Sequence, residues 1–117
     1  MEFTHLLPEE IEKTSFAIIE GELVERGIRV EEDKKPVLYR VIHTTADFEY
    51  ANTMTFSDQA LEKAKEAIKR GAHIITDTQM AYAGINKKRL ADFGGEVHCY
   101  MADEDVAKEA KERRTTR

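Results

Sequence analysis

Apolar stripes with helical spacing alternate along this chain with short apolar runs, and this alternation constrains the fold more than any other feature. Apolar residues that recur every three or four positions are typical of amphipathic helices, whereas short runs between turn signals are typical of strands. The expected strands cover residues 52–56, 73–77 and 96–101. Strands that alternate with helices form right-handed crossovers and a parallel sheet. The pattern therefore predicts an α/β fold with a parallel sheet.

The expected helices have recognisable start and stop signals. One apolar stripe runs through residues 8–26, and Gly27 follows it as a stop. Pro36 suits the first turn of the next helix, and Ser57 is expected to cap the one after it. Further helical segments are expected at residues 36–43, 57–70, 80–85, 86–90 and from 103 onward. These helices separate the expected strands, as the parallel arrangement requires.

The length of 117 residues predicts one α/β domain over residues 1–117, because such a chain can bury one hydrophobic core. A doubly wound sheet usually has about five or six strands. Only three candidate strands occur here before the chain ends in or just after a helix. The domain is therefore expected to be truncated.

Composition and charge exclude several classes of protein. The net charge is −5 and no basic stripe is visible, so nonspecific nucleic-acid binding is not expected. No apolar stretch approaches the ~18 residues that a membrane span needs, and the first residues do not resemble a signal peptide. We expect a cytoplasmic protein with neither a membrane nor a nucleic acid as partner. The single cysteine, Cys99, rules out an internal disulfide.

His43 is the residue that the pattern singles out as a candidate catalyst. It follows the apolar positions Val37, Leu38, Val41 and Ile42, so its imidazole is expected near a helix C-terminus. Unpaired carbonyls there favour the imidazolium form by roughly 0.3–1 kcal/mol. A histidine so placed can hold a proton and release it near neutral pH. Histidines at helix ends are nevertheless more often caps or surface residues than catalysts.

Other kinds of site have weaker support. Asp77 follows an expected strand, where α/β folds bind ligands, and it is either a functional carboxylate or, more commonly at such turns, a helix cap. The four histidines have no ligand-like spacing along the chain. Motifs for dinucleotide, P-loop and hydrolase sites are absent. We therefore expect neither a metal ion nor a cofactor.

An ordered set of short segments carries a resemblance to a known family. The segments are residues 15–19, 41–43, 67–72, 75–80, 84–85 and 116–117. The most specific are Ser-Phe-Ala-Ile-Ile, the histidine after its apolar helix, and Asp-x-x-Met. In order and spacing they resemble the N-terminal part of the precorrin isomerases, or precorrin-8X methylmutases, of cobalamin biosynthesis.

This resemblance implies a flavodoxin-like, three-layer α/β/α fold and a homodimer with its site near the subunit interface. It implies an isomerase that moves a methyl group from C-11 to C-12 of precorrin-8 or cobalt-precorrin-8, a tetrapyrrole, without a redox cofactor. His43 would be the catalytic proton donor. The substrate-binding positions would be Ser15, Thr44 and Thr45 in the loop after the histidine, Asn86, and Arg117 as an anchor for a peripheral carboxylate.

A noncatalytic α/β binding module or a receiver-like signalling module is the alternative. A receiver domain has a similar length and carries a phosphoacceptor aspartate at a strand end, as Asp77 would be. It also needs an acidic pair after its first strand and a lysine after a late strand, and neither is evident here. Members of the resembled family are about twice as long, so this chain is expected to need a further segment or a partner for activity.

Overall fold

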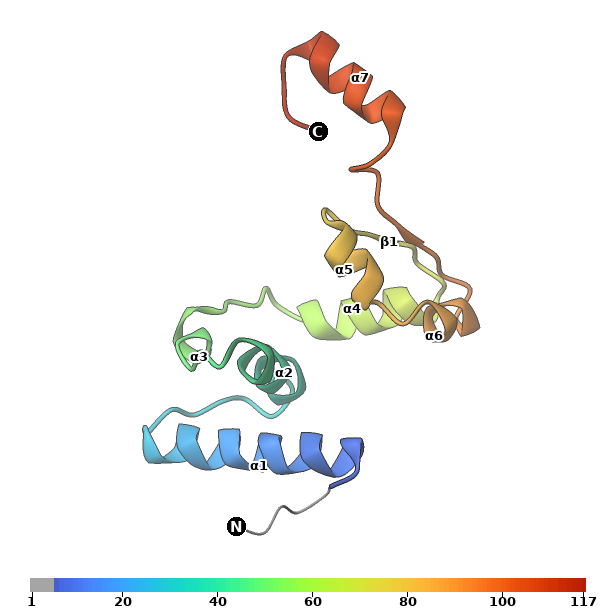
Figure 1. The fold of residues 1–117 in the computed structure, drawn as a ribbon. Helices are drawn as coiled ribbons and strands as arrows, with labels where there is room; N and C mark the ends of the chain where they lie inside the picture. Colours follow the sequence, from blue (N-terminus) through green and yellow to red (C-terminus); the bar gives the residue numbers. More distant parts are fainter. Residues whose placement is uncertain (1–5) are drawn as a thin grey trace. The chain divides into compact units, whose positions relative to one another are not determined.

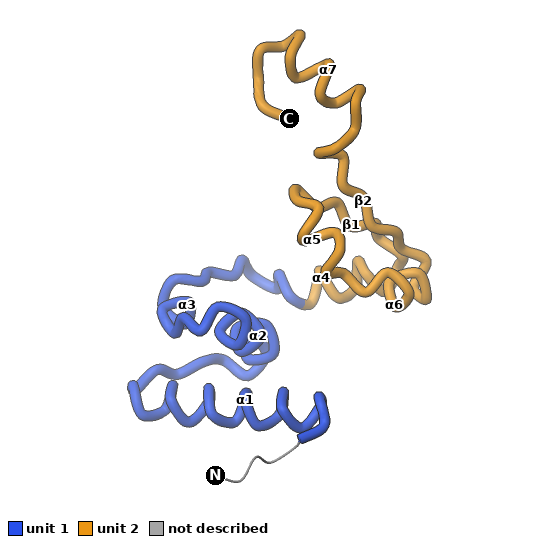
Figure 2. Tube along the Cα trace, in the orientation of Figure 1, with its two compact units in different colours: residues 1–61 blue, residues 62–117 orange. Residues whose placement is uncertain are grey.

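The computed structural model describes residues 6–117, which form helices and short strands grouped into two compact units (Figures 1 and 2). The units are residues 1–61 and residues 62–117. The first contains α1 (Pro8–Glu25), α2 (Lys35–Thr45) and α3 (Tyr50–Thr53), and α4 (Ala60–Lys69) crosses the boundary. The second contains β1 (Ile74–Ile75), α5 (Gln79–Gly84), α6 (Lys87–Asp92), β2 (Val97–His98) and α7 (Glu104–Arg113). No helix in the described residues is long and apolar enough to cross a bilayer.

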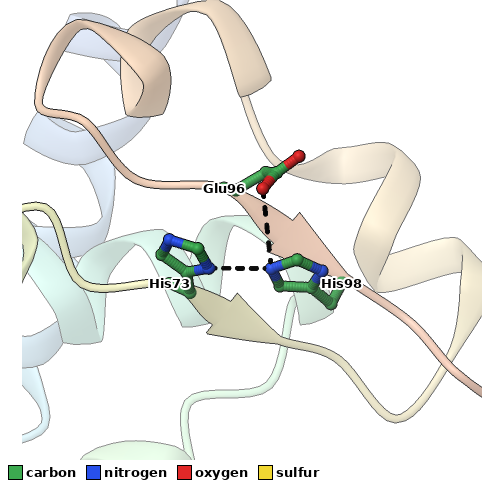
Figure 3. A group of neighbouring side chains, drawn as sticks. All are labelled: His73, Glu96 and His98. Carbon is green, nitrogen blue, oxygen red and sulfur yellow. Dashed lines mark hydrogen bonds and ion pairs between the residues drawn. The ribbon is translucent and has the colours of Figure 1, made fainter.

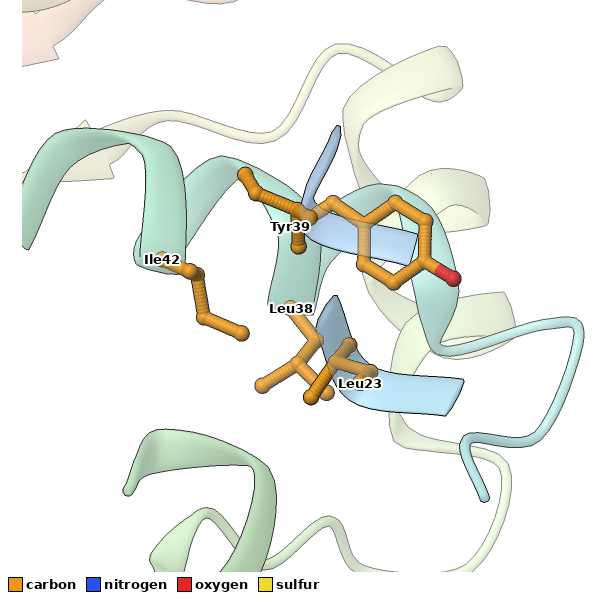
Figure 4. Close-up of a cluster of buried hydrophobic side chains, with 5 residues drawn as sticks. Leu23, Leu38, Tyr39 and Ile42 are labelled. Atoms are coloured by element: carbon orange, nitrogen blue, oxygen red, sulfur yellow. The ribbon is translucent and has the colours of Figure 1, made fainter. Parts of the chain in front are cut away.

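The core of the first unit lies between α1 and α2. Five buried side chains form one cluster: Ile19, Leu23, Leu38, Tyr39 and Ile42 (Figure 4). Their i, i+4 spacing on each helix aligns one apolar face with the other helix. The predicted face of α2 is only partly right, because Leu38 and Ile42 are buried whereas Val37 is 37% exposed.

Gly27 ends α1, as the sequence predicts. Its φ of +71° lies in the left-handed region, which glycine adopts without steric cost. The Ile28 N–H donates to the Leu23 carbonyl at 2.9 Å, and the Gly27 N–H donates to the Val24 carbonyl at 3.0 Å. This pair of bonds is a Schellman motif. Ile28 packs against the core cluster immediately afterwards.

The predicted strand over residues 52–56 is wrong, because Tyr50–Thr53 form the short helix α3. The Asp47 carboxylate accepts a hydrogen bond from the Glu49 N–H at 2.9 Å, and the Thr53 hydroxyl donates to the Glu49 carbonyl at 3.1 Å. These local bonds favour a turn and then a helix over an extended chain. Met54, which the strand prediction uses as an apolar position, instead packs against the core cluster.

The helix expected from Ser57 begins later, at Ala60. Gln59 has a left-handed φ of 56°, so the preceding residues form a turn rather than a helical start. Ser57 contributes its backbone carbonyl, which accepts from the Ala60 N–H at 3.1 Å. The cap predicted for the Ser57 side chain is therefore wrong, whereas the helix itself and its end before Gly71 are confirmed.

The second unit contains the predicted parallel strand pairing. β1 and β2 pair in parallel, with Ile74 beside Val97 and Ile75 beside His98. The strands are shorter than expected, and the short helices α5 and α6 connect them along the chain, as predicted. The α/β class is thus confirmed. The prediction of one domain over residues 1–117 stays a prediction.

Gly95 allows the chain to pass close to its neighbours before β2. A Cβ atom at this position would lie 2.6 Å from the Ala72 carbonyl oxygen and 2.9 Å from Leu90 Cδ1. Gly95 and Leu90 are both buried. The absence of a side chain therefore sets the separation between the segments that lead into β1 and β2.

Candidate functional site

His43 lies in the last turn of α2, as the sequence predicts, and it contacts Ser15 on α1. The Ser15 hydroxyl oxygen is 2.7 Å from Nδ1 of the imidazole. α2 ends at Ala46, whose φ of 54° is left-handed and whose N–H donates to the Ile42 carbonyl. The helix therefore stops immediately beyond the histidine. Packing of α1 against α2 brings together two residues that are 28 positions apart.

The bond to Ser15 fixes which nitrogen of His43 can serve a substrate. In the neutral ring, a serine that donates to Nδ1 leaves the proton on Nε2, and in the imidazolium both nitrogens carry protons. In these two states Nε2–H is a donor, whereas in the other neutral tautomer Nδ1–H donates to Ser15 and Nε2 is an acceptor. Nε2 makes no hydrogen bond to the described residues, and His43 is exposed. The geometry is therefore suited to a proton donor that faces outward.

Phe16 and an ion pair flank the contact between Ser15 and His43. The Phe16 ring meets His43 edge to face, with centroids 5.9 Å apart. One turn earlier on each helix, the Arg40 guanidinium donates to the Glu12 carboxylate and also lies over the Phe16 ring. The hydrogen bond from Arg40 holds the pKa of the Glu12 carboxyl below its usual value. Two polar contacts and an aromatic ring thus connect α1 to α2 along one side.

Thr44 and Thr45 belong to α2, which corrects their predicted place in a loop. The Thr44 hydroxyl donates to the Arg40 carbonyl at 2.9 Å, and the Thr45 hydroxyl donates to the Val41 carbonyl at 2.8 Å. Both side chains are exposed beside the histidine. Each hydroxyl oxygen retains acceptor capacity after donating its proton, and that of Thr45 accepts from the Asp47 N–H.

The remaining predicted residues belong to the second unit. Asn86 caps α6 by accepting from the Arg89 N–H at 3.0 Å. Arg117 donates from Nη1 to the Met101 carbonyl at 3.0 Å and is exposed. The predicted cap at Asp77 is wrong, because the Thr78 hydroxyl accepts from the Ala81 N–H and caps α5 instead. Asp77 is exposed at the turn before it.

Sequence spacing misses one cluster in the second unit. His73, Glu96 and His98 each offer a ligand atom, and these atoms lie within 4.8 Å of one another. The signal that could reveal the cluster is strand register rather than spacing, because His73 and Glu96 directly precede the paired residues Ile74 and Val97. Parallel pairing of β1 and β2 brings His73 close to Glu96 and His98, although they are far apart in the sequence.

Two hollows of the first unit do not include His43. One hollow of about 330 Å³ lies beside Gly27 and Tyr39, and another of about 320 Å³ lies beside Leu38 and Phe56. In the first, Lys35 already donates to the carboxylates of Glu20 and Glu32. Lys35 is therefore already paired with both carboxylates. His43 is instead exposed at the surface of this unit.

Comparison with known proteins decides the family. The model of the precorrin-8X methylmutase family matches residues 10–117. The chain belongs to this family. The match confirms the resemblance of the ordered segments and favours the isomerase interpretation over the signalling-module alternative.

Relatives in this family support the same assignment. Cobalt-precorrin-8 methylmutase of Salmonella typhimurium is 42% identical over 113 residues, which are 94% of this chain and 54% of the relative. The enzyme of the same name from Priestia megaterium is 39% identical over 110 residues, 94% of this chain and 48% of the relative. The chain thus spans about half the length of the curated methylmutases that it matches.

A solved structure of the family shares the fold. Precorrin-8X methylmutase from Thermus thermophilus superposes with a TM-score of 0.75 and 38% sequence identity. The match covers 86% of this chain and 50% of the Thermus chain. Similarity in both sequence and fold therefore extends over most of the methylmutase-like chain described above.

Proposed function

We propose that this chain contributes to an isomerase that moves a methyl group from C-11 to C-12 of precorrin-8 or cobalt-precorrin-8 in cobalamin biosynthesis. Membership of the methylmutase family supports the reaction class. The contact between Ser15 and His43 carries the mechanism, because it occupies Nδ1 and leaves Nε2 of an exposed imidazole free for a substrate. The cytoplasm, where we place this reaction, stays a prediction.

His43 acts in this proposal as the proton donor to the macrocycle. Nε2–H protonates the ring as the methyl group moves, which compensates the change in conjugation. Because an isomerisation changes no atoms overall, the protonated macrocycle must lose one proton to form the product, and His43 must regain one before the next turnover. Ser15 orients the imidazole through Nδ1 and is a positioning residue in this scheme.

The predicted binding residues provide donors and acceptors for the periphery of a tetrapyrrole. Thr44 and Thr45 are exposed next to His43, and their hydroxyl oxygens can accept hydrogen bonds. Arg117 uses one N–H for the Met101 carbonyl, and its remaining donors can form a bidentate pair with a carboxylate. Asn86 accepts from Arg89 through its amide oxygen, which leaves its NH₂ group as a donor.

We also propose a flavodoxin-like, three-layer arrangement and a homodimer with the site near the subunit interface. The exposure of His43 supports a site that a second subunit completes, because a site for a large ligand normally encloses most of that ligand. Exposed apolar side chains on α1 add support, because Ile18 is 65% exposed and Val24 is 70% exposed. Sedimentation equilibrium at micromolar concentration tests the assembly. A well-folded monomer of 13.4 kDa would contradict the dimer.

His43→Ala tests the catalytic proposal. In an active preparation of the protein, turnover of the precorrin substrate should fall by about 10²–10⁴-fold, the usual contribution of a positioned acid. Folding should change little, because the side chain is exposed. Turnover is measured from the change in the corrinoid absorption spectrum, and folding is checked by circular dichroism. An unchanged rate would remove His43 from the mechanism.

Ser15→Ala tests the positioning role and Thr14→Ala is its control. Thr14 is the exposed neighbour of Ser15 on α1. Ser15→Ala should lower kcat and displace the pH profile of the reaction, because the imidazole loses its partner at Nδ1. Thr14→Ala should leave both unchanged. A Ser15→Ala enzyme that raises only KM would instead assign Ser15 to substrate binding.

A further inference from the structure

Parallel pairing places three side chains with metal-binding groups on one face of the strand pair β1–β2. His98 is beside Ile75 in the register, and His73 precedes Ile75 by two residues. Glu96 likewise precedes His98 by two residues. Side chains two residues apart on a strand point to the same face. His73, Glu96 and His98 therefore face one another across the pair, as Figure 3 shows.

The distances in this cluster are close to those of a metal site. Nδ1 of His73 is 2.9 Å from Nε2 of His98, and that nitrogen is 4.0 Å from Oε2 of Glu96. Zinc binds imidazole nitrogen and carboxylate oxygen at about 2.0–2.2 Å, so two ligand atoms on a tetrahedral ion are roughly 3.3 Å apart. Small rotations of His73 and Glu96, both exposed, would bring all three atoms to that spacing.

The side chains differ in exposure and packing in a way that suits such a site. The His98 side chain is only 28% exposed, and its ring stacks between those of His73 and Tyr100, with centroids 5.1 and 5.9 Å away. Glu96 is 73% exposed. His98 is thus a fixed ligand, and the other two can adjust to an incoming ion.

Hydrogen bonding alone leaves the cluster poorly satisfied. Two imidazole nitrogens in contact can share one proton, but protonation of both rings would place two cations together. The Glu96 oxygen, at 4.0 Å, is too far from Nε2 of His98 for a hydrogen bond. A divalent cation accepts electron pairs from both neutral imidazoles and is attracted by the carboxylate.

We propose that His73, Glu96 and His98 bind one divalent transition-metal ion, with Zn²⁺ as the expected occupant. Two histidines and one carboxylate are an established ligand set for Zn²⁺ that leaves a position open for water. The ion would connect β1 to β2, which are short strands joined by bonds such as that from the Ile74 N–H to the Glu96 carbonyl. Metal binding would therefore stabilise the second unit. None of these three ligands takes part in the His43 chemistry proposed above.

Titration of the untagged protein, freed of metal by a chelator, tests this site. Calorimetry with Zn²⁺ alone should show one ion per chain, and Co²⁺ should give the visible absorption bands of a low-symmetry site. The melting temperature should rise with Zn²⁺. Binding should weaken in acid, because the imidazoles must lose their protons to bind.

Variants of the ligands decide where the ion binds. His98→Ala and Glu96→Gln should each weaken Zn²⁺ binding by on the order of 100-fold, because loss of a ligand should cost at least as much affinity as loss of a group that only orients a ligand. Glu104→Gln, an exposed carboxylate at the start of α7, and His43→Ala are controls that should retain it. Circular dichroism verifies folding, and His73→Gln replaces any variant that does not fold. Absence of Zn²⁺ binding, or unchanged affinity in the ligand variants, would overturn the proposal.

Discussion

The two units of this methylmutase-like chain are stabilised in different ways. In the first, five buried side chains from α1 and α2 form one continuous cluster. In the second, the buried apolar side chains Leu90, Val97 and Ala110 lie on three separate elements and do not belong to that cluster. The described parts of α4 and α5 contain no buried residue. The first unit therefore depends on side-chain packing more than the second.

Local backbone contacts replace packing in the second unit. Thr78 and Asn86 cap α5 and α6 through their side chains. Gly95 permits a close approach that any other residue would obstruct. Such features restrict the chain without burying much apolar surface. Removal of buried side-chain volume should thus lower the stability of the first unit most, whereas a substitution that restricts or obstructs the backbone should lower the stability of the second.

Ile42→Ala should have the largest effect on stability. The side chain is 1% exposed, and truncation of a buried isoleucine to alanine costs about 2–5 kcal/mol. Val97→Ala in the second unit should cost less, because valine loses less volume and its neighbours are more open to solvent. Met80→Ala, at an 86% exposed position, is the control and should be nearly neutral. Urea unfolding monitored by circular dichroism measures all three, and equal costs for Ile42→Ala and Val97→Ala would contradict the comparison.

Gly95→Ala should have an intermediate effect that is confined to the second unit. The added Cβ would collide with the Ala72 carbonyl and with Leu90, and overpacking of this kind typically costs about 1–3 kcal/mol. Hydrogen exchange should show faster exchange at the Ile74 and Thr76 amides, which donate to β2 and its flank. Gly84→Ala is the matched control, since a Cβ there meets nothing within 4 Å. If both amides exchange as slowly in Gly95→Ala as in the parent, the segments that lead into β1 and β2 can move apart to make room for the added Cβ atom.

The smallest expected effect concerns pH and the ion pair between Glu12 and Arg40. The pKa of Glu12 is lowered in the folded state by its hydrogen bond from Arg40. A lowered carboxyl pKa contributes stability above the unfolded pKa, and this contribution is lost as the pH falls through the folded pKa. Glu12→Gln should therefore flatten the acidic part of the stability curve slightly, and Glu9→Gln, at an exposed position of the same helix, should not. If Glu12→Gln and the parent lose stability identically in acid, the ion pair does not contribute to the pH dependence of the free energy of unfolding.

Local sequence signals predict the elements whose cause is local. The helix over residues 8–26 and its stop at Gly27 follow from periodicity and from the left-handed preference of glycine. The strand prediction for residues 52–56 is wrong because alternation of apolar residues only suggests a strand, whereas the hydrogen bond from the Glu49 N–H to Asp47 stabilises a turn directly. A side-chain bond to the backbone decided between two conformations that hydrophobicity alone did not separate.

Contacts between distant residues are harder to predict. The position of His43 at a helix end follows from the pattern of α2, but its bond to Ser15 requires the rotation of α1 against α2. The approach of His73 to His98 likewise requires the register of two strands. A shift of one residue in that register would move the side chains to opposite faces. Such details depend on tertiary packing, which residue spacing does not encode.

The outward orientation of the histidine has an isotopic consequence for the proposed reaction. Nε2 of His43 makes no hydrogen bond to the described part of the chain and the residue is exposed, so before substrate arrives its proton exchanges freely with water. Each catalytic cycle would then begin with a proton drawn from the solvent. A label removed from one tetrapyrrole would be diluted into the water and would not pass to the next, so the enzyme would have no isotopic memory between turnovers.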